Sequence, residues 1–357
     1  MAVVLFHFFP AWVSMLPGLR PAATAASHGG LGVDLFFILS GFILSYVYNA
    51  GEARFGSVQY RRFLWFRLAR VFPNHVATLA VLMAMIAVAT HFGIALTGDY
   101  PLSGLPFQLT MTHAWPYIPG GMWNYPSWTI SAEWFAYLCV FPVSWYMLRR
   151  RLSTAWSIAV GYGFLAIWLF GFSDPWFINY QALLQVSCEF IAGSMFFGAF
   201  RWADPVTGAC QRYASLILAV ILALLAFAPD DISIAMKVVV LLFPMLLLGV
   251  TAETSMVSRM FSTAPVLWLG RVSYALYMSH AVTLKVIKII LPAERYVNAP
   301  LVIRLMVLCS NLVLILFVAA VLYYIVEIPA RNFMRKVSIS RSDRKARPTP
   351  GTARANK

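Results

Sequence analysis

The sequence predicts an all-α, polytopic integral membrane protein with about ten transmembrane helices and both termini in the cytoplasm. Its 357 residues are 61% hydrophobic and only 11% charged, whereas a soluble domain carries about 25% charged residues. The mean hydropathy of +0.75 agrees with this class. Ten apolar runs approach or exceed the roughly 20 residues that cross a bilayer. These observations exclude both a disordered protein and an ordinary water-soluble enzyme.

The ten candidate spans follow one another along nearly the whole chain. Stretches such as Ile217–Ala228 are apolar around the entire helix circumference, as expected for a helix in lipid. The runs at 213–229 and 234–250 are short for a crossing. The full set comprises residues 1–17, 31–49, 71–96, 128–148, 154–172, 181–200, 213–229, 234–250, 265–291 and 302–326.

The distribution of basic residues predicts the orientation of these spans. Twenty-one Lys and Arg residues fall in the loops and tail of one side, and only four fall on the other. Because basic loop residues favour the cytoplasmic face, the richer side is assigned to the cytoplasm and holds both ends of the chain. The net charge of +14 is thereby explained by topology. We therefore expect membrane lipid and no nucleic acid as a partner.

The chain is expected to form one transmembrane domain, residues 1–338, followed by a basic tail, residues 339–357. The tail is rich in Pro, Ser and Arg and has no apolar pattern, which predicts disorder and contact with anionic lipid. The four cysteines lie within or beside apolar runs and show no metal-binding spacing. We therefore expect small core cysteines and no metal site.

Five ionisable residues fall at membrane depth, where each is costly and marks a candidate functional site. They are His7, Asp34, Glu133, Glu189 and His280. The predicted topology places them in the central and outer parts of the bilayer, on different helices. A histidine with a nearby carboxylate can act as a general base. Simple hydrogen bonding between helices and a proton relay in a transporter remain alternatives.

A second cluster, RRFLWFRLARVFP, contains Arg61, Arg62, Arg67 and Arg70 on the predicted cytoplasmic side. Arg67 and Arg70 are spaced i, i+3 and can project from one helical face. Guanidinium groups bind phosphate in a bidentate manner, which favours a phosphate site. An ordinary cytoplasmic anchor of a membrane helix is the alternative.

Two further features have a plain structural explanation. The outer loop 97–127 is rich in Trp, Tyr, Pro and Gly. Its aromatic rings could stack on a sugar, and an interfacial aromatic belt explains them as well. Ser40, in LSGF, is interpreted as a small packing residue between helices because it lacks a nucleophile setting.

Six segments carry a family resemblance. They are VVLFHF (3–8), GVDLFFILSGFILSY (32–46), RRFLWFRLARVFPNH (61–75), WTISAEWFAYLCVFP (128–142), LGRVSYALYMSHA (269–281) and VEIPAR (326–331). In this order and spacing the chain resembles the membrane-bound acyltransferase-3 family, whose members O-acylate sugars and some other hydroxyl compounds. The resemblance covers essentially the whole chain.

The resemblance implies a bacterial inner-membrane enzyme that transfers an acyl group, expected to be acetyl, from acyl-CoA to a carbohydrate hydroxyl. The acceptor would be a surface or exported polysaccharide or a lipid-linked glycan. His7 matches the essential histidine of the first helix and would be the base. Arg67 and Arg70 match the Arg-x-x-Arg element that contacts the phosphates of CoA, with Arg61 and Arg62 beside them. The polar positions that line the family's site are matched by Asp34, Glu133 and His280.

In the expected chemistry His7 accepts the proton of the acceptor hydroxyl, and Glu133 or Asp34 stabilises the imidazolium. His280 and Tyr274 are candidate oxyanion donors. A macrolide-like or lipid acceptor and a proton-coupled glycan transporter remain alternatives, and a homo-oligomer is compatible with the sequence. Family members carry an arginine at the start of the first helix. Only six residues precede His7, so we expect a chain that begins downstream of the family's usual start, with an inactive copy as a further alternative.

Overall fold

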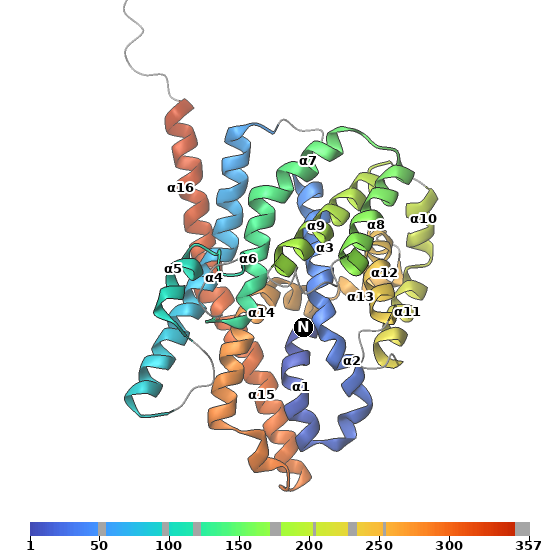
Figure 1. Cartoon of the computed structure of the whole chain (residues 1–357). Coiled ribbons are helices and arrows are strands. Elements are labelled where there is room, and N and C mark those ends of the chain that lie inside the picture. The colour runs from blue at the N-terminus through green and yellow to red at the C-terminus, as the bar shows by residue number, and fades with distance from the viewer. Residues whose placement is uncertain are drawn as a thin grey trace, which may run out of the picture.

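The computed structural model describes residues 1–48, 55–94, 100–116, 123–171, 180–202, 205–227, 234–252 and 255–346, with side chains up to 337. All regular structure in these residues is helical, which confirms the all-α prediction. The helices form a bundle in which α1, α14 and α15 extend toward one end, and α16, α7 and the first part of α4 extend toward the other (Figure 1).

Each predicted apolar run contains helix, and two of the runs have the predicted boundaries. Helix α9 spans Gln181–Phe200 and α12 spans Ile234–Val250. The other long helices are α1 (Ala2–Met15), α3 (Gly32–Val47), α4 (Ser57–His91), α8 (Thr154–Gly171), α11 (Ala214–Phe227), α14 (Ala264–Ile290), α15 (Leu301–Val321) and α16 (Ile328–Ala346). The shorter ones are α2 (Ala23–Ser27), α5 (Leu105–Leu109), α6 (Trp128–Phe135), α7 (Phe141–Arg149), α10 (Pro205–Arg212) and α13 (Met256–Phe261).

The helix composition is that of a multi-pass membrane protein. In the described residues, five helical segments are long and apolar enough to cross a bilayer, and six if the pair α10 and α11, bent by 62°, is one span. Helices α1 and α12 are apolar but shorter. The five segments are Pro17–Val47, Ser57–His91, Thr154–Gly171, Gln181–Phe200 and Leu301–Val337. The predicted count of ten spans and the cytoplasmic location of both termini stay predictions.

Two predicted spans contain π-helical turns that end two residues before a proline. The run 128–148 consists of α6, the turn η5 (Ala136–Val140) and α7, whose second residue is Pro142. After α15, the turn η8 (Leu322–Glu327) leads into α16, whose second residue is Pro329. Proline lacks an N–H and clashes with the carbonyl four residues earlier, so the preceding turn widens. A buried glutamate accompanies each turn: Glu133 lies on α6 just before the first, and Glu327 is the last residue of the second.

At two places the helices extend well beyond the expected runs. The arginine-rich segment before residue 71 is helix from Ser57 onward, not loop. Helix α16 continues through the first part of the expected tail as far as Ala346, while residues 347–357 lie outside the described residues. The four cysteines differ in burial. Cys188 and Cys210 are buried as expected, whereas Cys139 and Cys309 are exposed on the helix surface.

Helix α9 forms the centre of the bundle. In the most apolar stretch of α9, 72% of the residues are buried, whereas the share is 22% in the corresponding stretch of α8, which packs along α9. Helix α3 crosses α9 closely because Gly41 and Gly193 lie at the contact, where the backbones of the two helices meet. The same helix faces carry Asp34 on α3 and Glu189 on α9 at helical spacing, so the close crossing also brings these carboxyl groups together.

Helix α1 is anchored by an apolar stripe. Val4, Phe8, Trp12 and Met15 are buried against α14 and α15. The next residues around the helix, Val3 and His7, are spaced i, i+4 and turn toward the interior of the bundle. The packing of the stripe thus sets the direction of the His7 side chain.

Candidate active site

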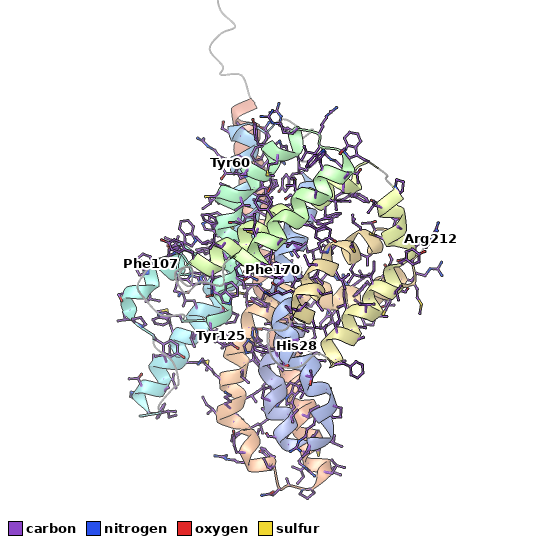
Figure 2. The ribbon with its side chains drawn as sticks, turned by 45° about the vertical axis from the view of Figure 1, so that its right-hand side comes forward. His28, Tyr60, Phe107, Tyr125, Phe170 and Arg212 are labelled. Atoms are coloured by element: carbon purple, nitrogen blue, oxygen red, sulfur yellow. The ribbon has the colours of Figure 1, made fainter. Side chains whose placement is uncertain are left out.

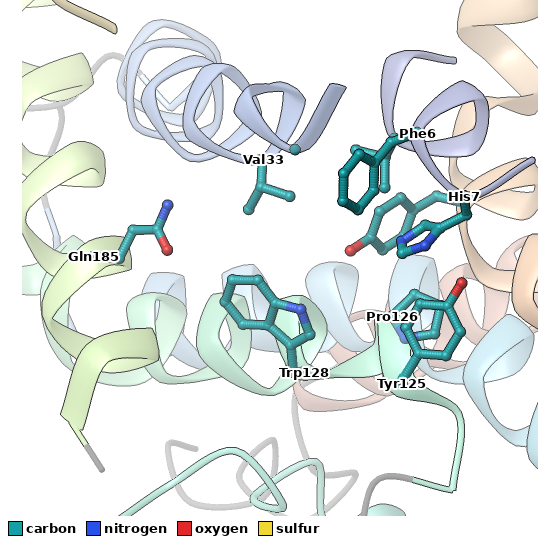
Figure 3. A pocket seen from close by; sticks show the side chains of 10 residues that line it. Phe6, His7, Val33, Tyr125, Pro126, Trp128 and Gln185 are labelled. Carbon is teal, nitrogen blue, oxygen red and sulfur yellow. The ribbon is translucent and has the colours of Figure 1, made fainter. Parts of the chain in front are cut away.

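A cavity of about 300 Å³ lies where α1, α3, α6, α9 and α14 approach one another. Figure 3 shows His7 and Tyr125 on one side of it and Gln185 on the opposite side, with Val33 and the indole of Trp128 between them. Tyr125 belongs to the 3₁₀ turn η4 (Tyr125–Ser127) and lies near the middle of the molecule (Figure 2). The wall is therefore apolar and aromatic, with a few polar groups.

The structure brings together the two histidines that the sequence singled out. The rings of His7 and His280 stack with centroids 5.3 Å apart. The Tyr125 ring lies 4.8 Å from that of His7, and its hydroxyl lies 3.4 Å from His280 Nε2. His280 is fully buried, whereas His7 is half-buried and borders the cavity. His7 is therefore the member of the pair that can meet a substrate.

The hydrogen bonds of His280 define its tautomer. Its Nδ1 lies against the backbone carbonyl oxygen of Tyr277. A carbonyl only accepts, so Nδ1 carries the proton and Nε2 is left as an acceptor for the Tyr125 hydroxyl. His280 thus acts as an oriented neutral imidazole that holds Tyr125 beside His7.

Glu133 lies on the side of the site that faces the arginines. Its Oε1 accepts hydrogen bonds from the Ser40 hydroxyl, at 2.9 Å, and from the Tyr137 hydroxyl. Both Arg67 and Arg70 interact with it electrostatically. In the described part of the chain it makes no hydrogen bond with His7. Ser40, interpreted from the sequence as a packing residue, is instead a donor to a buried carboxylate.

Asp34 reaches the cavity through another side chain. The Gln185 amide nitrogen lies 3.2 Å from Asp34 Oδ1 and 3.4 Å from Glu189 Oε1. The two carboxyl groups also interact with each other, and Trp168 interacts with Asp34. This pair lies behind Gln185, opposite His7.

The four predicted phosphate-binding arginines fall into two pairs. Arg67 is half-buried with its guanidinium 5.8 Å from the Tyr48 ring, and together with Arg70 it acts on Glu133. Arg61 and Arg62 are exposed earlier on α4, with Arg62 over the Phe66 ring at 5.3 Å. Of the two pairs, Arg67 and Arg70 are therefore the one that interacts electrostatically with a buried side chain, Glu133.

Sequence reasoning missed several cavity residues. Tyr125 and Trp128 were visible only as part of an aromatic-rich region with two explanations, and Gln185 and Tyr277 carried no signal of their own. The candidate oxyanion donor Tyr274 is not available, because its hydroxyl donates to the Val71 carbonyl at 2.6 Å. Part of the aromatic-rich loop, residues 97–99 and 117–122, lies outside the described residues.

A buried histidine pair supports the turn that carries Tyr125. The rings of His75 and His113 stack 5.7 Å apart. His75 Nε2 lies 2.7 Å from the Gln108 carbonyl, and His113 Nε2 lies 2.9 Å from the Ser127 hydroxyl. These contacts tie α4 and the segment after α5 to the η4 turn. The position of Tyr125 thus depends on two histidines that do not themselves line the cavity.

This pair should make the protein sensitive to acid. Burial, together with the adjacent His75 ring, lowers the pKa of His113 from 6.5 to about 4. In the unfolded chain the His113 imidazole becomes protonated as the pH falls below about 6.5. In the folded chain it becomes protonated only as the pH falls to about 4. Stability therefore decreases across that window, by up to about 3 kcal/mol.

Glutamine does not titrate in this range. We therefore expect the thermal stability of His113→Gln to decrease less steeply than that of the wild type between about pH 6.5 and about pH 4. Thermal unfolding in detergent measures this. His91→Gln, at an exposed position, serves as the matched control and should keep the wild-type slope. Equal slopes for His113→Gln and the wild type would show that His113 does not resist protonation.

The fold and this site define a membrane-bound enzyme. Residues 1–325 match the profile of an acyltransferase domain, and the chain thus belongs to the acyltransferase-3 family and is an acyltransferase. The family resemblance and the enzyme class predicted from the sequence are confirmed.

Two relatives indicate the breadth of the similarity. The acyltransferase MdmB of Streptomyces mycarofaciens is 32% identical over 151 residues, which cover 40% of this chain and 36% of that protein. The exopolysaccharide production protein ExoZ of Rhizobium meliloti (strain 1021) is 27% identical over 272 residues, or 72% of this chain and 78% of that protein. No solved structure matches the chain.

Proposed function

We propose that this acyltransferase moves an acetyl group from acetyl-CoA to a hydroxyl of a carbohydrate, at the inner membrane of a bacterium. The observation that carries the proposal is the accessible His7 at a central cavity, backed by Tyr125 and His280. The similarity to an exopolysaccharide production protein favours a polysaccharide or lipid-linked glycan as the acceptor.

In the proposed reaction His7 accepts the proton of the acceptor hydroxyl as its oxygen attacks the thioester carbon. A tetrahedral intermediate forms and the bond between carbon and sulfur breaks. The proton on His7 then passes to the CoA thiolate, so no charge accumulates. Burial raises the pKa of the Tyr125 phenol above its ordinary range. Tyr125 therefore stays protonated. Its hydroxyl can turn from His280 Nε2 toward the oxyanion and donate its hydrogen bond there as the intermediate forms.

The carboxylates would act on the histidines through other side chains. Glu133 and Tyr125 both interact electrostatically with Tyr277, whose ring lies 5.5 Å from that of His280. Asp34 reaches the cavity through Gln185. We therefore assign the two carboxylates positioning and electrostatic roles, in place of the direct contact with His7 that the sequence suggested.

The two substrates would enter from different sides. Arg67 and Arg70 would attract the phosphates of the donor, and both interact electrostatically with Glu133. The indole of Trp128 offers an aromatic surface for one sugar ring, opposite the polar amide of Gln185. The cavity of about 300 Å³ is at the lower end for small-molecule sites, which suits one terminal unit of a larger acceptor. A macrolide-like or lipid acceptor is the second candidate within this class.

The test is transfer of radiolabelled acetyl from acetyl-CoA by the purified protein in lipid nanodiscs, with polysaccharide fragments, a macrolide and lipid as competing acceptors. We expect label on the carbohydrate and release of free CoA in equal amount. Label only on the macrolide or lipid would overturn the proposed acceptor. A matched Arg67→Gln variant should raise the KM for acetyl-CoA about tenfold because a charge-assisted phosphate contact is lost.

A proton-coupled glycan transporter would behave differently in the same system. It would consume no acetyl-CoA, and glycan loaded into vesicles would move in response to a pH gradient. Glycan movement without acetyl transfer would replace the proposed reaction by transport.

A further inference from the structure

The last described helix brings two more arginines to the arginine pair on α4. Helix α16 packs alongside the first half of α4 (Figure 1). The charges of Arg331, Arg67 and Arg70 all act on Arg335, whose guanidinium also lies 5.8 Å from the Phe66 ring of α4. The Trp65 indole nitrogen donates to the Met334 carbonyl at 2.8 Å, which fixes the two helices side by side.

This group of four arginines, Arg67, Arg70, Arg331 and Arg335, contains more positive charge than its surroundings neutralise. Glu327 is the carboxylate within it and accepts from Arg331 at 3.4 Å. Glu327 also accepts from the Asn74 amide at 2.7 Å, so part of its capacity is used elsewhere. Glu133 interacts with Arg67 and Arg70 from the interior side.

Two of the guanidinium groups have donors without a partner. The buried Nε atoms of Arg67 and Arg331 make no hydrogen bond in the described structure. A buried N–H without an acceptor costs about 1–3 kcal/mol, and the cost is larger for a charged group. Like charges held close together add a further repulsion. An anion bound among the four arginines would remove both penalties at once.

We infer that Arg331 and Arg335 complete a binding site for the phosphate groups of a nucleotide-type donor, together with Arg67 and Arg70. The inference rests on the proposed function, because coenzyme A is the donor named there. It adds a second helix to the site: α4 supplies one arginine pair at i, i+3 and α16 supplies another at i, i+4. Two helices that converge on one ligand can bind more than one phosphate in a bidentate manner.

Charge matching favours the nucleotide over a lipid headgroup. Coenzyme A carries a diphosphate and a separate phosphate, whereas an anionic phospholipid typically offers one phosphate. Four converging arginines suit the more highly charged group. The site is also linked to the interior, because Arg70 acts on Glu133, which in turn acts on Tyr277 at the cavity. A ligand that extends from the arginines toward His7 would follow this path.

The experiment is coenzyme A binding, by calorimetry, to the whole protein in nanodiscs of zwitterionic lipid. Arg335→Gln is the main variant because Arg335 is exposed and has no carboxylate partner in the described residues. Arg331→Lys keeps a positive charge beside Glu327 but loses the planar guanidinium that binds phosphate in a bidentate manner. We expect each to weaken binding about tenfold, with a shallower salt dependence for Arg335→Gln. Arg149→Gln, an exposed arginine on α7, is the matched control and should bind as the wild type does.

The outcomes separate the two proposals. If Arg67→Gln weakens binding but Arg335→Gln and Arg331→Lys do not, α16 is not part of the site and only this inference is wrong. If the wild type binds no coenzyme A, the proposed donor fails as well. If Arg335→Gln changes only the amount of anionic lipid that copurifies with the protein, the arginines bind headgroups and the inference is overturned. Thermal unfolding of each variant checks that it is folded.

Discussion

Replacing His7 with alanine should lower the rate of acyl transfer by about 10²–10⁴-fold, because it removes the base that accepts the hydroxyl proton. The loss should appear in kcat, whereas coenzyme A affinity should be retained, since the arginines lie on α4 and α16. The measurement is acetyl transfer by purified protein under saturating acetyl-CoA, alongside a binding measurement on the same sample.

His91→Ala is the matched control for that variant. His91 is exposed at the end of α4, and its ring lies against that of Phe92. It should leave both kcat and affinity unchanged. A His7→Ala protein that is folded, binds coenzyme A and still transfers acetyl at the wild-type rate would show that His7 is not the base.

Placing a side chain on Gly193 should have the largest effect on folding. A methyl carbon at this position would overlap the backbone carbonyl oxygen of Ile38 on α3, which is rigid. The reverse contact exists at Gly41, where the added carbon would overlap the Phe190 carbonyl on α9. We expect Gly193→Ala to cost about 3 kcal/mol, at the upper end for an overpacked site, because two backbones must separate. A lower midpoint of thermal unfolding in detergent would measure the effect.

The control for this prediction is Gly163→Ala on α8. No heavy atom lies within 4 Å of the carbon added there, and alanine favours helix more than glycine does. Its midpoint should equal or exceed that of the wild type. If Gly193→Ala proves as stable as Gly163→Ala, the close crossing of α3 and α9 is incorrect, and with it the meeting of Asp34 and Glu189.

Much of the local structure could be predicted from the sequence. A run of apolar residues buries its backbone polar groups by forming helix, whatever its neighbours are. For this reason α9 and α12 begin and end where their apolar runs do. The family was also predictable, because short motifs such as those around His7 and His280 occur in a fixed order. The π-helical turns could not be located in this way, although the prolines that follow them are visible.

The partners of each polar side chain were decided by tertiary structure alone. From the sequence, Glu133 and His7 are two buried polar groups at similar depth, yet Glu133 faces the arginines and His7 faces Tyr125 and His280. Periodicity indicates which face of a helix is polar, but the crossing of two helices determines which faces meet. At α3 and α9 that crossing depends on two glycines whose side chains are absent, so hydropathy does not reveal it.

Tertiary contacts also decided which residues lie next to the arginines of α16. In the sequence Arg331 and Arg335 continue into a basic tail and look like part of a cytoplasmic anchor. Their position beside Arg67 and Arg70 arises because the turn η8 and Pro329 set the direction of α16, and because α16 then packs along α4. Composition and spacing along one chain determined that these residues are helical and charged. Contacts between helices distant in sequence determined that the four charges share one place.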